Sequence, residues 1–126
     1  MRRSKILIER LRRLLENYKE IIANIESLSL TTKGKCTILR LKVILIDQSR
    51  VYIREIWRGG SLVDYSYWWV SSDDSPIEGW DNAPHHPEIP TYPHHKHTKE
   101  GVKELRNPQL EEFFKMLRNS ILQPIE

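Results

Sequence analysis

Several residue types are scarce in this chain of 126 residues, and each shortage narrows the class of protein. Cysteine occurs once, at Cys36, so no disulfide can form within the chain. The sequence has no long apolar run and no secretory signal, which indicates a soluble, cytoplasmic protein with no membrane segment. The length predicts a single domain over residues 1–126, with a core large enough to fold without a structural metal.

Histidine is missing from most of the chain, because all five histidines lie within residues 81–97. Neutral imidazole binds metals, and its ordinary pKa of about 6.5 lets it gain or lose a proton near neutral pH. Four prolines stiffen the same segment and disfavour helix at the residue before each of them. The sequence therefore predicts the functional site on a stiff loop that carries His85, His86, His94, His95 and His97.

The first interpretation of this loop is acid–base cleavage of RNA without a metal cofactor. One histidine would take the proton of the ribose 2′-hydroxyl, and another would protonate the leaving 5′-oxygen. Asp81 could orient one imidazole, and Lys96 or Arg58 could stabilise the charge that develops on phosphorus. The candidates for acid and base are His86, His95 and His97, followed by His85 and His94, with interchangeable roles.

The second interpretation is a bound transition metal such as zinc, held by three or four of the five histidines. Asp81 or Glu88 could add an oxygen ligand or accept a hydrogen bond from a ligating ring. The spacing matches neither zinc fingers nor the His-Glu-x-x-His helix of metalloproteases. A third reading is purely structural, with the histidines anchoring the loop through backbone carbonyls.

Basic and aromatic residues outside the loop predict contact with nucleic acid or an acidic partner. Positive charge is concentrated near the N-terminus at Arg10, Arg12 and Arg13, and Arg58 ends a predicted strand. Tyr67 and Trp80 are the aromatic side chains expected nearest the site, where they could stack on RNA bases. A binding module without catalytic activity therefore stays open as an alternative.

Hydrophobic periodicity predicts an α+β fold of one domain. Apolar residues at helical spacing predict a long N-terminal helix from Ser4 to about Ser27. Alternating segments then predict an antiparallel sheet of three or four strands, over residues 36–47, 51–58, 62–71 and 77–81, with Gly59-Gly60 as a hairpin turn. The histidine loop follows, and residues 94–98 could return as a short strand. Asn107 and Pro108 predict the start of a C-terminal helix.

Three stretches of the central half of the chain carry a family resemblance: Tyr65-Ser66-Tyr67, then Trp80-Asp81-Asn82-Ala83-Pro84-His85-His86-Pro87-Glu88, and then Pro93-His94-His95-Lys96-His97. Together they resemble the TumE family of prokaryotic toxin–antitoxin toxins. That family often has a histidine after the tyrosine pair and an arginine near the second stretch, whereas this chain has Trp68 and Gly79. The resemblance implies a toxin that acts on RNA, with a helix-turn-helix antitoxin as partner, and a homodimer is a further alternative.

Overall fold

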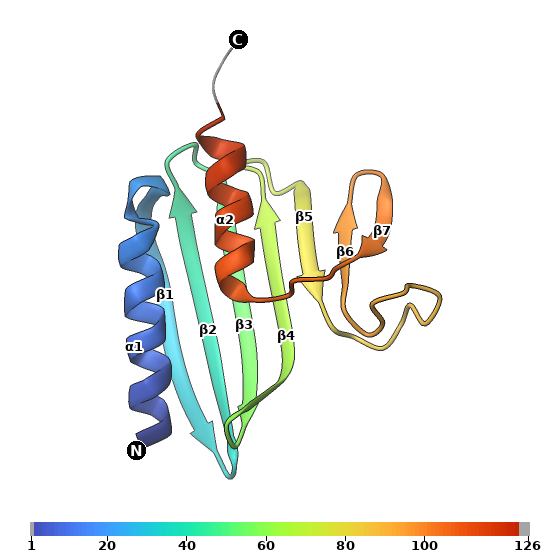
Figure 1. The fold of residues 1–126 in the computed structure, drawn as a ribbon. Coiled ribbons are helices and arrows are strands. Elements are labelled where there is room, and N and C mark those ends of the chain that lie inside the picture. The colour runs from blue at the N-terminus through green and yellow to red at the C-terminus, as the bar shows by residue number, and fades with distance from the viewer. Residues whose placement is uncertain (1, 124–126) are drawn as a thin grey trace.

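The computed structural model describes residues 2–123, which form one seven-stranded antiparallel sheet and two α-helices (Figure 1). Each strand pairs with the strand that precedes it in the chain. The predicted combination of terminal helices and an antiparallel sheet is therefore confirmed. The elements in chain order are α1 (Arg2–Asn17), the 3-10 helix η1 (Lys19–Ile21), β1 (Ile22–Lys33), β2 (Cys36–Leu45), β3 (Arg50–Arg58), β4 (Ser61–Val70), β5 (Pro76–Asp81), β6 (His95–Thr98), β7 (Gly101–Glu104) and α2 (Leu110–Ile121).

Both helices lie on the same face of the sheet, with α1 beside β1 and β2 and α2 across its centre (Figure 1). Leu11 and Leu14 of α1 share one buried core with Phe113 of α2, and Leu41 and Tyr67 supply that core from the strands. Because side chains alternate along a strand, the residues between these core positions point to the opposite face. We call that opposite face, which no helix of residues 2–123 covers, the open face.

The predicted N-terminal helix is too long. α1 ends at Asn17, and the chain from Ile22 onward forms β1, which pairs with β2 through a turn at Gly34. Ile22, Ile25 and Leu28 are three residues apart, which is helical spacing, yet all three are paired with core residues of β2. The register shifts in β1 between residues 22 and 24 and between 25 and 27 explain this, because a bulge adds a residue and changes the face of those that follow.

The predicted number of strands is also wrong, because the sheet has seven strands rather than three or four. The predicted strands correspond to β2–β5, and the suggested return strand corresponds to β6. The first half of β1 falls within the predicted helix, which extends to about Ser27, and the four residues of β7 are too few and too polar to show a period. α2 begins at Leu110, two residues after the predicted start at Pro108. Its N-cap is Gln109, whose backbone is extended, and residues 107–109 are not helical.

A buried carboxylate joins α1 to the sheet. Glu55 on β3 is fully buried and accepts hydrogen bonds from Arg10 of α1 at 2.9 Å, from the Trp57 indole at 3.0 Å and from the Tyr67 hydroxyl. Burial and the negative charge of Glu55 raise the pKa of Tyr67, so its hydroxyl stays protonated and donates. Arg10 also contacts Glu111 of α2 at 3.3 Å, so its guanidinium holds both helices against the sheet.

Candidate active site

Three of the five histidines converge at the β5–β6 end of the open face. Asp81 on β5 is paired with His95 on β6, and Gly79 is paired with His97 in the same two strands. Strand alternation therefore points Asp81, His95 and His97 to one face. The loop between β5 and β6 brings His86 to them, and possible ligand nitrogens of His86, His95 and His97 all lie within 4.8 Å of one another. We call these three residues the histidine cluster.

Asp81 holds two members of the cluster with one carboxylate. Its Oδ1 lies 3.0 Å from Nε2 of His95, and its Oδ2 lies 3.1 Å from Nε2 of His97. The backbone N–H of Ala83 also donates to Oδ1 at 2.9 Å, which fixes the carboxylate at the end of β5. The side chain of Asp81 is only 15% exposed, so its charge acts on both rings with little competition from water. The structure places this carboxylate beside two imidazoles, and the expectation that it orients one of them in a reaction stays a prediction.

His95 is the buried member of the cluster, with 2% of its side chain exposed. Its Nδ1 lies 2.9 Å from the carbonyl oxygen of Pro93, and since a carbonyl only accepts, Nδ1 carries a proton. Its Nε2 faces the Asp81 carboxylate, which is also an acceptor when ionised. Because both ring nitrogens of His95 face acceptors and the ring is enclosed, His95 is suited to hold the site together rather than to contact a large substrate.

His86 and His97 are the accessible members of the cluster. Their side chains are 30% and 31% exposed, and their ring centroids are 5.9 Å apart. Nδ1 of His86 lies 3.3 Å from Glu88, which leaves its Nε2 for other contacts. Nε2 of His97 faces Asp81, which leaves its Nδ1. Each accessible ring therefore has one nitrogen held by a carboxylate and one nitrogen available.

Trp68 and Gly79, the two departures from the TumE pattern, face each other in the register of β4 and β5. The Trp68 ring covers Gly79, and a Cβ built at Gly79 would lie 2.4 Å from that ring. The same ring stacks on His97, with centroids 5.3 Å apart and planes inclined by 24°. The two departures are thus linked, because glycine at residue 79 leaves room for the tryptophan that packs on His97.

Gly79→Ala should destabilise the protein by about 1–3 kcal/mol, because the added methyl group drives the Trp68 ring off β5 and away from His97. In a Trp68→Ala background there is no ring for the methyl group to displace. The same change should then cost nothing or stabilise the protein slightly, because alanine restricts the unfolded chain and so favours folding by about 0.4–1 kcal/mol. Urea unfolding of the two single variants and the double variant measures this coupling. An equal cost of Gly79→Ala in both backgrounds would contradict the contact.

The other two histidines lie outside the cluster. Nδ1 of His94 lies 2.9 Å from the Tyr65 hydroxyl. Burial and the charge of Asp81 raise the pKa of Tyr65, so that hydroxyl stays protonated. Burial and then the neighbouring His95 lower the pKa of His94, which favours its neutral form. His85 is exposed on the loop surface. The structure thus separates His94 and His85 from the three histidines that converge.

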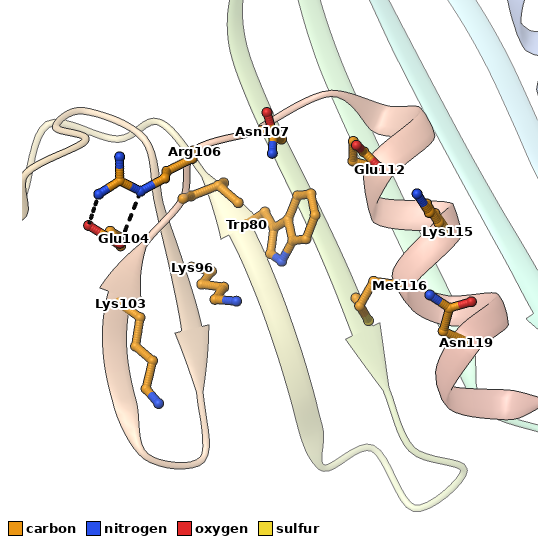
Figure 2. Close-up of a pocket in the computed structure, with 11 residues that line it drawn as sticks. Trp80, Lys96, Lys103, Glu104, Arg106, Asn107, Glu112, Lys115, Met116 and Asn119 are labelled. Atoms are coloured by element: carbon orange, nitrogen blue, oxygen red, sulfur yellow. Dashed lines mark hydrogen bonds and ion pairs between the residues drawn. The ribbon is translucent and has the colours of Figure 1, made fainter. Parts of the chain in front are cut away.

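Lys96, predicted to stabilise charge beside the histidines, does not join them. It lies between His95 and His97 in β6, so its side chain points to the opposite face, where it is paired with Trp80. There it lines a pocket of about 530 Å³ between β6, β7 and α2, together with Lys103, Arg106 and Lys115 (Figure 2). The sequence period that brings His95 and His97 together is the reason that Lys96 is excluded from the cluster.

The residues predicted to bind nucleic acid are also far from the cluster or enclosed. Tyr67 and Trp80 are core residues whose rings pack on Phe113, so their faces are not open to a base. Arg10 is held by Glu55 and Glu111, and α1 lies on the other side of the sheet from the cluster. Arg12 and Arg13 pair with Glu9 on α1, and Arg58 is exposed at the end of β3.

Sequence reasoning missed a polar groove on the open face, next to the cluster. The groove has a volume of about 460 Å³, and its lining on β2, β3 and β4 includes the polar and aromatic residues Arg40, Lys42, Tyr52, Arg54, Ser66 and Trp68. A signal was available, because these residues alternate with core residues such as Leu41 and Ile53 along β2, β3 and β4. The register that aligns these residues across the three strands could not be predicted from the alternation alone.

Comparison with known proteins gives one family. The family model described as "Toxin TumE" matches residues 11–123, which is most of the chain and includes every residue of the cluster. Comparisons with curated proteins and with solved structures give no match. Within residues 2–123, neither helix combines the length and the apolar character needed to cross a membrane. The resemblance seen in the three central stretches is confirmed, and the chain belongs to the TumE family of toxins.

Proposed function

We propose that this toxin acts by cleaving RNA, with His86 and His97 as the acid and base. The observation that supports this most is the pair of accessible imidazoles 5.9 Å apart, each with one nitrogen at a carboxylate and one nitrogen available. Acid–base cleavage needs two imidazoles that can reach the phosphodiester from two sides, each with a nitrogen available for proton transfer. Each positioned proton transfer contributes roughly a hundred- to ten-thousandfold to the rate.

The hydrogen bonds suggest how the two roles are divided. His97 donates its Nε2 proton to Asp81, so its Nδ1 would be the base that takes the proton of the ribose 2′-hydroxyl. The 2′-oxygen then attacks phosphorus, and the bond from phosphorus to the 5′-oxygen breaks. His86, whose Nδ1 lies 3.3 Å from Glu88, would act in its protonated form and give that oxygen the proton of its Nε2. The products are a 2′,3′-cyclic phosphate and a free 5′-hydroxyl.

His95 and Asp81 are positioning residues in this scheme. Asp81 sets the tautomer of His97, and His95 fixes the second oxygen of Asp81 while it is itself held by the Pro93 carbonyl. This arrangement resembles the orienting carboxylate of a catalytic triad in its role. Lys96 takes no part, because its side chain is on the other face of β6.

The toxin family also implies an antitoxin partner. We propose, from the family resemblance, that the partner is a helix-turn-helix protein encoded beside the toxin. Expression of the toxin alone should arrest growth of a bacterial host, and co-expression of the neighbouring gene should restore growth. Arrest that the neighbouring gene does not relieve would contradict this part of the proposal.

A metal-dependent nuclease or phosphotransferase is the second candidate, and specific contacts favour it. The nitrogens of His86, His95 and His97 lie within 4.8 Å of one another, with Asp81 beside two of them. Nδ1 of His86 and of His95 are held by Glu88 and by the Pro93 carbonyl, as the second nitrogens of metal-bound histidines usually are. The donor set would suit zinc, which could activate a water molecule as the nucleophile.

Metal content separates the two candidates. Acid–base cleavage predicts a purified protein without stoichiometric transition metal, whose activity is unchanged by excess EDTA. The second candidate predicts close to one metal per chain by elemental analysis, loss of activity in EDTA, and loss of that metal in a His95→Ala variant. Since His95 is the most enclosed ring of the cluster, this variant tests the binding site and not only the exposed surface.

A further inference from the structure

We propose that the open face of the sheet is a binding track for single-stranded RNA that leads into the histidine cluster. This inference rests on the proposed function and names the form of its substrate. The groove of about 460 Å³ across β2, β3 and β4 is where the track begins. The cluster on β5 and β6 is where it ends.

Strand register joins the groove to the cluster in two straight rows. Cross-strand partners in the first row run from β2 to β6 and are Arg40, Arg54, Ser66, Asp81 and His95. The second row runs beside it and consists of Lys42, Tyr52, Trp68, Gly79 and His97. Neighbouring strands are about 4.8 Å apart, so each row covers about 19 Å. An extended chain laid along these rows meets the groove first and the cluster last.

The charges at the groove end of the rows match a phosphate backbone. The groove is lined by three cations, Arg40, Lys42 and Arg54, and by no acidic residue. Among the described residues Arg40 has no ion-pair partner, while Lys42 pairs with Glu26 at 3.0 Å and Arg54 with Asp64 at 2.7 Å. Both pairs are partly or largely exposed, and such pairs contribute little. Their cations can therefore exchange a carboxylate for a phosphate at small cost.

The aromatic residues of the second row match unpaired bases. Tyr52 and Trp68 are cross-strand neighbours at the groove, and Tyr52 is 37% exposed. A duplex keeps its bases stacked inside, whereas single strands offer their faces to aromatic side chains. The Trp68 ring also stacks on His97. A base bound at Trp68 would bring the adjoining phosphate to His86 and His97, where the proposed cleavage takes place.

The test is binding of a 2′-O-methyl RNA oligonucleotide, which lacks the reacting 2′-hydroxyl, to the full chain by fluorescence anisotropy at several salt concentrations. An Arg40→Ala, Arg54→Ala double variant should bind at least tenfold more weakly. Its plot of log K against log salt should be shallower, with the magnitude of the slope reduced by about 1.4, the value for two phosphate contacts on a single strand. Tyr52→Ala should weaken binding by about fivefold or more. The matched control is Arg12→Ala, Arg13→Ala on α1, which removes two exposed charges and should bind as the wild type does.

Four outcomes would overturn the inference: no binding by the wild type, equal binding of duplex RNA, unchanged binding by the Arg40, Arg54 variant, or loss of binding in the α1 control instead. Impaired capture of the antitoxin by the Arg40, Arg54 variant, with RNA binding intact, would also overturn it by assigning the face to a protein. Circular dichroism confirms that each variant folds. Because the probe cannot be cleaved, binding that follows the expected pattern without any cleavage of ordinary RNA leaves the track standing and refutes only the proposed reaction.

Discussion

His97→Ala should lower RNA cleavage by about a hundred- to ten-thousandfold, while the unfolding free energy falls by about 1–3 kcal/mol because Trp68 and Asp81 each lose a contact. The ring is 31% exposed and lies at the surface end of the cluster, so its loss removes the proposed base without opening the core. His86→Ala should have a similar effect, because it removes the proposed acid. The measurement is the initial rate of cleavage of a short RNA by each purified variant, with urea unfolding alongside.

His85→Ala is the matched control for this experiment. His85 precedes His86 in the chain and is exposed, but it lies outside the cluster. Its removal should leave the cleavage rate within a fewfold of the wild type. If His97→Ala and His86→Ala retain the wild-type rate, or if His85→Ala is equally inactive, the assignment of acid and base to the cluster is wrong.

Asp81→Asn should reduce cleavage by up to about ten-thousandfold, the scale known for a carboxylate that sets the tautomer of a catalytic imidazole. The asparagine amide replaces one carboxylate oxygen by an NH₂ group, which donates where His95 or His97 now meets an acceptor. One ring must then turn or change its tautomer. The side chain keeps its size, so the fold should be retained.

The split between kcat and KM distinguishes this positioning role from a merely structural one. Because Asp81 is expected to act through the imidazoles and not to touch the RNA, Asp81→Asn should lower kcat and leave KM within a fewfold of the wild type. Asp74→Asn provides the control, because Asp74 is an exposed carboxylate that pairs with Arg50 in the turn before β5, whereas Asp81 lies at the opposite end of that strand. An unchanged kcat in the folded fraction of Asp81→Asn would show that Asp81 acts only on the fold.

The sequence located the convergence of histidines better than it predicted the sheet. Confinement of all histidines to residues 81–97 identified the loop, and the two-residue period of a strand correctly aligned His95 with His97. The ranking of His86 ahead of His85 agrees with the three rings that converge, but the physical reason is the conformation of the proline-rich loop, which no local pattern predicts. The same period places Lys96 on the opposite side from His95 and His97, and the structure has it there.

Two features could not be predicted because they depend on pairing between distant segments. The apolar residues of β1 keep helical spacing, and only the bulges formed on pairing with β2 bring Ile22, Ile25 and Leu28 to one face. The rows from Arg40 and Lys42 to the cluster require the register of five strands. Hydrophobic periodicity describes only a short stretch of sequence, so it predicts neither the bulges nor the register of the rows.

The most direct test of the account is RNA cleavage by the purified full chain in excess EDTA, with analysis of the product ends, for the wild type and for a His95→Ala, His97→Ala double variant. Acid–base catalysis at the cluster predicts cleavage that persists in EDTA, yields 2′,3′-cyclic phosphate and 5′-hydroxyl ends, and disappears in the double variant. Activity that returns only with added metal, cleavage that survives in the double variant, or the absence of any cleavage by the wild type would contradict it.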